Sequence, residues 1–409
     1  MSAVPDTIVY NPHPRAAAAT KSRHNLQPIN GSDFTPGQVC SISIPCGQRG
    51  AFLNPSQSYL KFRVNNLDGT NTLTPDFSAA SFIRVLEVVY GSNVLEYVSE
   101  YGALYHTLDD AQGDSERNRA SGSIMEGNHA STRRVGAAIA VDSSTTFCIP
   151  LISGLLGSGQ SKYLPVGSLV RNHLKVNLTW ASLADAQVGA CTSWKISDVE
   201  FVADYVTVAA DVATEIERLN AGGYRIPLST FTLNSSTVPG GSSAASVLIS
   251  GNSRSCKTLL SIFRLQSNAG NAAKKSISNR YNPIGDTGHW QYNVGGSMVP
   301  AMPVRSLAES HAELQKAFHA FSAADNHGNC RLADWAATEG SFVIAADLDH
   351  FSHKSDVAEA GADVSTSTMY LQCQFGAALG DTVALRVDTF LHSDAVLVID
   401  PQGQAQTIF

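Results

Sequence analysis

The chain has 409 residues, of which 43% are hydrophobic and only 15% are charged, and its formal net charge is −7. The length predicts two domains, and the low charge predicts a largely uncharged surface, as in β-rich proteins covered by neighbours or in secreted β proteins. The negative charge argues against a chain that binds nucleic acid over its whole surface, because neutralising phosphates requires clustered Lys and Arg.

The cysteines and the apolar runs narrow the class of protein further. No apolar run of about 18 residues and no N-terminal leader pattern is present, so we expect a soluble chain without a membrane span or a signal peptide. Seven cysteines without a CxxC pair predict neither a disulfide framework nor a zinc site, but reduced and mostly buried thiols. They are Cys40, Cys46, Cys148, Cys191, Cys256, Cys330 and Cys373.

Residues 1–35 predict an N-terminal arm rather than part of a domain. They contain four prolines, a run of four alanines and only three basic residues, Arg15, Lys21 and Arg23. Such an arm either reaches a neighbour or the inside of a particle, or is a loose terminus.

The first half then reads as strands with one helix. VCSISIP and SYLKFRVNN alternate apolar and polar residues, which predicts two strands joined by a turn-rich link, GQRGAFLNP. Residues 82–97 predict a hairpin around Gly91-Ser92-Asn93, and an apolar stripe predicts a helix over 97–112. A long loop is expected over 113–144, followed by extended segments at 146–156 and 169–180.

The middle of the chain, 195–232, predicts a hinge between two β domains. Residues 195–208 are rich in β-branched and aromatic side chains, which favours a strand. Val212, Ile216 and Leu219 then recur at helical spacing, and Gly222-Gly223 follows where a helix ends. A new extended segment begins at Tyr224.

The second half repeats the plan of the first. Strands are expected at 245–250, 258–266 and 290–294, and the turn Gly296-Ser297-Met298-Val299 resembles Gly91-Ser92-Asn93-Val94. An amphipathic helix over 305–321, a loop over 322–340, a strand over 341–348 and three closing strands at 368–375, 382–391 and 395–400 follow. The same order of elements in both halves predicts a structural repeat.

These elements predict an all-β fold of two side-by-side eight-stranded jelly rolls, a double jelly roll, with a few short helices. The expected divisions are an N-terminal arm over 1–35, a first jelly roll over 36–209, a connecting helix over 210–223, a second jelly roll over 224–400 and a C-terminal tail over 401–409. The arm and the tail are the segments expected to lie outside the strand pattern and to reach neighbours.

The sequence contains no nucleophile elbow, phosphate loop, dinucleotide fingerprint or HExxH pair, so we expect no enzyme. The nearest approach to a metal site is DLDHFSH, with Asp347, Asp349, His350 and His353, for which a polar strand end is favoured. His311 and His319 lie eight residues apart on the predicted helix, where packing and surface positions are favoured over function. We therefore expect no catalytic, cofactor-binding or metal-binding residues.

The order of segments resembles double jelly-roll major capsid proteins of polinton-like viruses, virophages and related tailless icosahedral viruses. The stretches that carry the resemblance span nearly the whole chain, and the chain is shorter than many members of that family. They are FTPGQVCSISIPCGQRGAFLNPSQSYLKFRV, YLPVGSLVRNHLKVNLTW with SDVEFVADYVTV, WQYNVGGSMVPAMPVRSLAESHAELQKAF and TVALRVDTFLHSDAVLVIDPQGQAQTIF.

The resemblance implies a structural virion protein, made in the host cell, that forms homotrimeric, pseudo-hexameric capsomers of an icosahedral capsid. The implied partners are other copies of itself through lateral capsomer contacts, penton and minor capsid proteins, and an internal membrane or the genome for the N-terminal arm. Sequence-specific nucleic-acid binding is not expected. Low charge is consistent with this role, because like charges repel at lateral contacts.

Two alternatives remain. A single jelly-roll capsid protein of a small RNA or single-stranded DNA virus should show one repeat and usually a strongly basic arm. A carbohydrate-binding or hydrolytic β-sandwich needs clustered aromatic side chains or two convergent carboxylates. The four tryptophans, however, are dispersed along the chain at Trp180, Trp194, Trp290 and Trp335.

Overall fold

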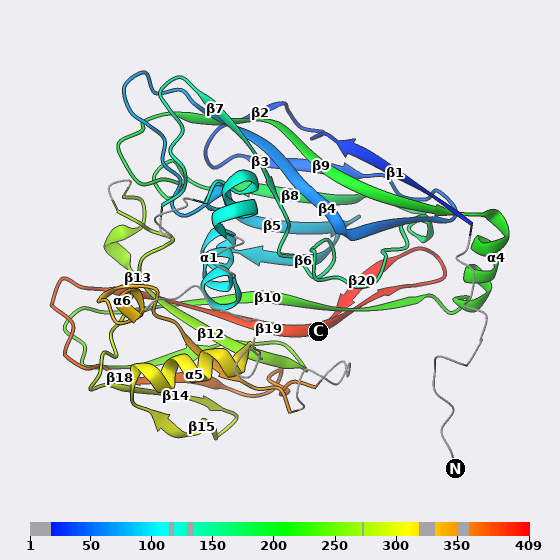
Figure 1. Cartoon of the computed structure of the whole chain (residues 1–409). Coiled ribbons are helices and arrows are strands. Elements are labelled where there is room, and N and C mark those ends of the chain that lie inside the picture. The colour runs from blue at the N-terminus through cyan, green and yellow to red at the C-terminus, as the bar shows by residue number, and fades with distance from the viewer. Residues whose placement is uncertain (1–17, 114–117, 129–134, 272–273, 319–331, 351–359) are drawn as a thin grey trace, which may run out of the picture.

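The computed structural model describes residues 18–113, 118–128, 135–271, 274–318, 332–350 and 360–409. In this part of the chain, two β-sandwiches lie side by side, with the N-terminal half above the C-terminal half in Figure 1. The predicted all-β architecture of two adjacent sandwiches is therefore confirmed. Each sandwich consists of two antiparallel sheets that bury their apolar side chains between them.

The first sandwich contains one sheet in the order β1-β9-β4-β7, with β2 also paired to β9, and one in the order β3-β8-β5-β6. β8 illustrates why these strands form, because Leu174, Val176, Leu178 and Trp180 alternate with more exposed residues and are all buried. The bounds are β1 Ala19–Leu26, β2 Asp33–Phe34, β3 Val39–Ile44, β4 Ala51–Asn66, β5 Ile83–Tyr90, β6 Asn93–Ser99, β7 Ser144–Ile149, β8 Leu174–Trp180 and β9 Trp194–Val208.

The second sandwich has the sheets β10-β19-β12-β17, with β20 paired to β19, and β11-β18-β14-β15. A separate two-stranded sheet joins β13 and β16. The bounds are β10 Tyr224–Val238, β11 Ala244–Ile249, β12 Cys256–Leu265, β13 Arg280–Tyr281, β14 His289–Val294, β15 Ser297–Val304, β16 Glu339–Gly340, β17 Ile344–Asp347, β18 Met369–Gln374, β19 Leu385–Ile399 and β20 Ala405–Ile408.

The two halves have the same strand order, so the predicted structural repeat is confirmed. β1, β9, β4 and β7 occupy the places of β10, β19, β12 and β17, and β3, β8, β5 and β6 those of β11, β18, β14 and β15. The hairpins close at Tyr90↔Asn93 and Val294↔Ser297. Gly91 therefore corresponds to Gly295, one residue before the match that the sequence suggested.

Short helices cover edges and connections. The α-helices are α1 Tyr101–Gln112, α3 Ser123–Met125, α4 Ala210–Leu219, α5 Leu307–Ala317 and α6 Leu332–Trp335, with 3-10 turns at Ala79–Phe82, Val166–Ser168 and Gln266–Asn268 and a π turn at Asn118–Gly122. The helix predicted between the halves is confirmed as α4, which follows β9 at the right of Figure 1. None of the described helices is long and apolar enough to cross a membrane.

α4 is attached to the first sandwich through the turn before β4. Arg49 donates to both carboxylate oxygens of Glu217 at 2.8 and 2.7 Å. Gly50 has a φ of +74°, and a Cβ there would lie 3.3 Å from that of Ala213, the buried residue of the helix. Close contact with Ala213 therefore favours glycine at this position.

The expectation that the two terminal segments lie outside the strand pattern is wrong for their described parts. Residues 19–26 form β1, which pairs with β9 over its whole length, and residues 33–34 form β2. Residues 405–408 form β20, which pairs with β19. Backbone hydrogen bonds to a long neighbouring strand hold these segments, although their side chains show little apolar pattern.

Four local predictions are also corrected. Residues 51–55 of the predicted turn-rich link over 47–55 belong to the 16-residue β4, and only residues 47–50 precede the strand. The two closing strands predicted at 382–391 and 395–400 are one strand, β19. The helix expected from residue 97 begins at Tyr101, because 97–99 complete β6. β15 contains two prolines and was not expected as a strand, but it is an edge strand, where missing donors are tolerated.

Candidate functional site: the contact between the two sandwiches

The most distinctive site is the contact between the two sandwiches, hereafter the inter-sandwich contact. It is formed by β6 and α1 of the first sandwich with β10, β12, β19, β20 and residues 276–280 of the second. In Figure 1, β6, α1 and β20 lie between the upper sheets and β10. The contact is polar at its centre, which is unusual for a surface buried within one chain.

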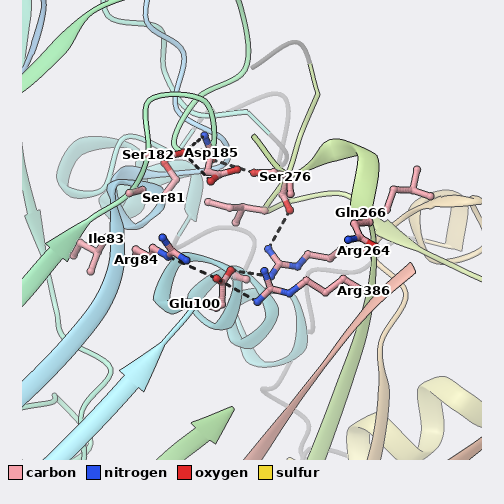
Figure 2. A pocket seen from close by; sticks show the side chains of 16 residues that line it. Ser81, Ile83, Arg84, Glu100, Ser182, Asp185, Arg264, Gln266, Ser276 and Arg386 are labelled. Carbon is pink, nitrogen blue, oxygen red and sulfur yellow. Dashed lines mark hydrogen bonds and ion pairs between the residues drawn. The ribbon is translucent and has the colours of Figure 1, made fainter. Parts of the chain in front are cut away.

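Four charged side chains form an ion cluster across this contact (Figure 2 shows three of them). Arg264 on β12 donates to Glu100 at 2.8 Å and, through Nε, to Asp388 on β19 at 2.9 Å. Arg386 donates to Asp388 at 2.8 Å and lies 3.3 Å from Glu100. Glu100 is thus the link from the first sandwich to a charged group of the second.

The charges in this cluster compensate one another. Burial alone would raise the pKa of Asp388, but the charges of Arg264 and Arg386 outweigh it and lower that pKa. Burial would likewise lower the pKa of Arg264, and the charges of Asp388 and Glu100 raise it instead. Asp388 and Arg264 therefore remain ionised near neutral pH, and removing one of them would leave the charge of the other buried without its partner.

A second buried carboxylate, Glu96 on β6, is held by hydrogen bonds from both sandwiches. It accepts from the backbone N–H of Gly154 at 2.7 Å, from the hydroxyl of Ser153 and, at 2.8 Å, from Thr230 on β10. Burial raises its pKa despite these donors. Glu96 therefore fixes a loop of its own sandwich and one strand of the other with the same side chain.

α1 carries the third polar contact. Arg280 of the second sandwich is fully buried, hydrogen-bonds His106, lies 3.0 Å from Asp110, and donates to the carbonyl of Ser341 at 3.1 Å. Nearby, Asp76 of the first sandwich accepts from the backbone N–H of Ile277 at 2.7 Å. A buried arginine with several partners is costly to remove but geometrically specific.

The C-terminal segment, residues 403–407, extends the inter-sandwich contact to the β5–β6 hairpin of the first sandwich. Tyr90 donates to the carbonyl of Gly403 at 2.7 Å, Asn93 donates to that of Ala405 at 3.0 Å, and Thr407 donates to that of Leu95 at 2.7 Å. β20 belongs to the second sandwich but hydrogen-bonds the β5–β6 hairpin of the first. The tail predicted to reach neighbours is thus engaged within its own chain over these residues.

A cavity of about 190 Å³ lies at the ion cluster and is lined by residues of both sandwiches, including Arg84, Glu100, Asp185, Arg264 and Arg386 (Figure 2). The three arginines pair with Glu100, whereas Asp185 accepts from the hydroxyl of Ser182 at 2.7 Å and from the backbone N–H of Gly270 at 2.8 Å. The described residues that line it include no histidine or cysteine. This arrangement can hold the two sandwiches at a defined angle.

The weak metal candidate lies elsewhere, at the end of β17. Asp347 accepts a hydrogen bond from the backbone N–H of Asp349 at 3.0 Å, and Nδ1 of His350 lies 2.8 Å from the carbonyl of Ala360. His353 lies outside the described residues. Within the described ranges, no group of three His, Cys, Asp or Glu side chains could hold a metal ion.

The other sequence candidates occupy packing positions where they are described. His311 lies edge-on to Trp335, with ring centroids 5.0 Å apart, and burial lowers its pKa; His319 lies outside the described residues. All four tryptophans are buried, so none of them forms an exposed aromatic platform. The six described cysteines are free thiols, four buried and two half-buried, and burial raises the pKa of Cys40 to about 12.

Sequence reasoning did not single out the residues of the inter-sandwich contact. The only available signal was a charged residue within an otherwise apolar strand, as with Glu96 in VLEYV, Arg264 in IFRLQ and Asp388 in LRVDTF. In a chain with few charges, such positions indicate a buried partner. They do not identify that partner, which lies over 100 residues away in sequence.

Comparisons with known proteins agree with this architecture. No protein-family model and no curated protein matches the sequence. Among solved structures, the PBCV-1 virus capsid is similar with a TM-score of 0.67 and 14% identity over 98% of each chain. The Faustovirus major capsid protein gives 0.58 and 7%, over 96% of this chain and 92% of that one, and the mavirus major capsid protein gives 0.53 and 12%, over 99% and 93%.

These similarities extend over nearly the full length of both chains in each comparison. At such low sequence identity they concern the fold, which is the arrangement that the strand order of the two halves already indicates. The chain has the double jelly-roll fold.

Proposed function

We propose that this double jelly-roll chain is the major capsid protein of a tailless icosahedral virus and assembles as homotrimers into the virion shell. The observation that carries the proposal is the repeat itself: two sandwiches with the same strand order are held side by side in one chain by a buried polar contact. The comparable solved structures come from a virus capsid and from two major capsid proteins.

The geometry suits a closed ring of three copies. Each chain supplies two similar sandwiches, so three chains place six similar sandwiches around one axis. A ring of six similar units can be repeated on a hexagonal lattice. Other copies are thus the first partners. Penton and minor capsid proteins are further partners in this proposal, and the residues before β1, which begins at Ala19, are the segment proposed to reach an internal membrane or the genome.

We propose the following division of the chain, based on which segments belong to each sandwich. The first jelly roll extends to residue 209, residues 210–223 connect, and the second jelly roll begins at residue 224. Because β1 and β20 complete sheets, the proposed arm is shortened to the residues before β1, and residues 401–409 are assigned to the second jelly roll.

Native mass spectrometry combined with negative-stain imaging tests the proposal. We expect the gently purified protein to have three times the monomer mass and to appear as particles with a six-lobed outline. A stable monomer at micromolar concentration would contradict the capsomer and would restore the carbohydrate-binding sandwich as the leading interpretation. Binding to glycans would then be measured on the same sample.

A further inference from the structure

A groove lined by basic residues lies at one end of the first sandwich, hereafter the basic groove. It has a volume of about 640 Å³ and lies between the turn of the β5–β6 hairpin and the segment that leads into β8. Three of its lining residues, Arg171, His173 and Lys175, are basic and exposed. The described residues that line it include no Asp or Glu, and Asp400 lines a neighbouring hollow that shares only Ser92 with the groove. In a chain with a net charge of −7, the basic groove is therefore a local region of positive potential.

The basic side chains of the groove have donors available for a ligand. In the described part of the chain, neither Arg171 nor Lys175 forms an ion pair with a carboxylate. Arg171 donates through Nε to the carbonyl of Gln402 at 3.1 Å, which leaves its two terminal amino groups. His173 accepts the backbone N–H of Cys46 through Nδ1 at 3.2 Å, so its Nε2 carries the proton and is a donor. Burial raises the pKa of Cys46 to about 11, so this thiol adds no negative charge to the groove at neutral pH.

The structural repeat provides an internal comparison for these positions. Tyr90 closes the β5–β6 hairpin and pairs with Leu174. Val294 closes the β14–β15 hairpin and pairs with Met369, so Leu174 and Met369 are counterparts.

The turns of the two hairpins support the same match. A Cβ at Gly91 would lie 2.8 Å from Nδ2 of Asn172, and a Cβ at Gly295 would lie 3.0 Å from Oγ of Ser367. The counterparts of the three basic residues are therefore uncharged, namely Thr366 for Arg171, Thr368 for His173 and Tyr370 for Lys175. Since the second sandwich builds the same hairpin and strand without charge at these positions, the fold does not require the basic residues, and they indicate a ligand.

The basic groove lies at the end of the molecule from which the N-terminal segment leaves. Cys46 of the groove and Arg49, which binds Glu217 of α4, belong to the same short connection between β3 and β4. Ala19 at the start of β1 pairs with Val208, the last residue of β9 before α4. In Figure 1, α4, the start of β1 and the turn before β20 lie on the same side. In the proposed function, the residues before β1 reach the interior of the particle, so the groove faces the interior as well.

We infer that the basic groove binds the phosphate groups of a nucleic-acid backbone, without preference for sequence. Arg and Lys are the side chains that neutralise backbone phosphates, and contacts to phosphate carry no sequence information. The inference rests on the proposed function, which supplies the packaged genome as the ligand, and it deepens that function by assigning a binding site to the folded part of the chain.

The charges around the groove favour a strand of nucleic acid over a membrane surface. α4 extends furthest at this end of the molecule in Figure 1, and it carries three carboxylates and one arginine. A flat anionic bilayer would meet this acidic helix together with the groove, which opposes binding. A flexible strand can enter the groove alone, as single strands do in the positively charged grooves of other proteins.

Fluorescence anisotropy with a labelled oligothymidylate and the full chain tests the inference. The wild type should bind the oligonucleotide with an affinity that falls as the salt concentration rises. Arg171→Gln combined with Lys175→Gln should weaken binding at low salt by at least about tenfold. The slope of log affinity against log salt concentration should decrease in magnitude by about 1.4, because each phosphate contact on a single strand contributes about 0.7.

The matched control removes the same charge elsewhere. Arg63→Gln combined with Lys195→Gln lowers the net charge equally, at the ends of β4 and β9 that lie away from α4. Both side chains are partly exposed and pair with exposed carboxylates of Asp198 and Asp33. This control should retain the wild-type affinity and salt slope. Equal losses in the two double variants would show that only the net charge matters and would overturn the inference.

Photo-crosslinking locates the site independently of any substitution. Ultraviolet irradiation of the wild type with oligothymidylate should give a crosslinked peptide that contains residues 170–175, identified by mass spectrometry. A bilayer is the competing ligand, since Val170 in the groove is an exposed apolar residue. Binding to vesicles of phosphatidylcholine and phosphatidylglycerol that depends on Arg171 and Lys175, without binding to the oligonucleotide, would overturn nucleic acid as the ligand.

The oligomeric state of the same sample separates the two proposals. A trimeric wild type that does not bind the oligonucleotide would contradict this inference alone. A monomeric wild type that binds it through residues 170–175 would contradict the proposed capsomer alone.

Discussion

At the residue scale, the inter-sandwich contact contains two buried carboxylates whose pKa values are shifted in opposite directions. Asp388 lies beside two arginines, whose positive charges lower its pKa. Glu96 has only neutral donors, so burial dominates and raises its pKa. The same contact therefore contains one group that favours the folded state when it is ionised and one that favours it when it is protonated.

Arg264→Met should destabilise the protein by about 3–5 kcal/mol, because it leaves Asp388 buried with one of its two arginine partners removed and leaves Glu100 without its shortest ion pair. Chemical denaturation measures this loss. Arg84→Met is the matched control. Arg84 is 60% exposed and lies 4.0 Å from Glu100, so the expected loss is only about 0–1 kcal/mol. Equal effects of the two substitutions would show that the ion cluster does not hold the sandwiches.

Glu96→Gln should change how stability depends on pH. The folded pKa of Glu96 lies above its ordinary value of 4.5, so the folded state binds this proton more tightly than the unfolded state. Its contribution is therefore complete below about pH 4.5 and is lost as the pH rises through the folded pKa. As the pH rises from about 4.5 through the folded pKa, the denaturation midpoint of the wild type should decrease relative to the midpoint of Glu96→Gln, which has no carboxylate to ionise at this position. A difference between the two proteins that is independent of pH would contradict the assignment.

At the scale of elements, one strand, β20, connects the two sandwiches. β20 pairs with β19 of its own sandwich and hydrogen-bonds the β5–β6 hairpin of the other. The turn before it is tight, because Gly403 has a φ of +77° and a Cβ there would lie 2.7 Å from Cγ2 of Val170 and 2.8 Å from the carbonyl oxygen of Ser168. The close approach of this turn to the first sandwich requires glycine.

Gly403→Ala should therefore lower stability more than an equivalent change at an open position. The positive φ alone costs about 1–2 kcal/mol for alanine, and the overlap with the first sandwich adds about 1–3 kcal/mol. Gly37→Ala is the control, since Gly37 has a φ of +81° and nothing within 4 Å of its added Cβ. Thermal denaturation of both variants measures the difference, and equal shifts would show that the turn tolerates a side chain.

At the scale of the whole molecule, the polar contact should make the two sandwiches unfold together. Buried ion pairs and hydrogen bonds shared by two halves are lost if either half opens, so neither half has an independent stability. Without this contact, we would expect two separate folding units, because each half of the repeat has its own sandwich core.

Hydrogen exchange monitors this coupling. We expect slowly exchanging amides in β9 and β19 to have the same opening free energy in the wild type, because they exchange only when the whole chain unfolds. In Arg264→Met the two strands should differ, as the sandwiches become separable. Different opening free energies in the wild type would show that the contact does not couple the halves.

Much of the fold could be predicted from local patterns. Alternation of apolar and polar residues marks β8 and the centre of β4, helical spacing followed by glycines marks α4, and the Phe-x-Ile segments at Phe147 and Phe342 mark the repeat. These features depend on which face of a segment is buried, and that periodicity is present in the sequence itself. Two β domains of similar plan follow from it.

Other features were decided only by the tertiary structure. β1 has little apolar pattern of its own, and it is a strand because β9, far away in the sequence, supplies backbone hydrogen bonds. β20 pairs with the preceding strand, β19, but the partners of its hairpin contacts in the first sandwich are over 300 residues away. Glu96 and Arg264 are buried, and Glu100 is partly buried, because their partners lie across the contact. A local pattern reports the burial of one face, but a shared strand edge or a compensated buried charge depends on two segments far apart in the sequence meeting in space.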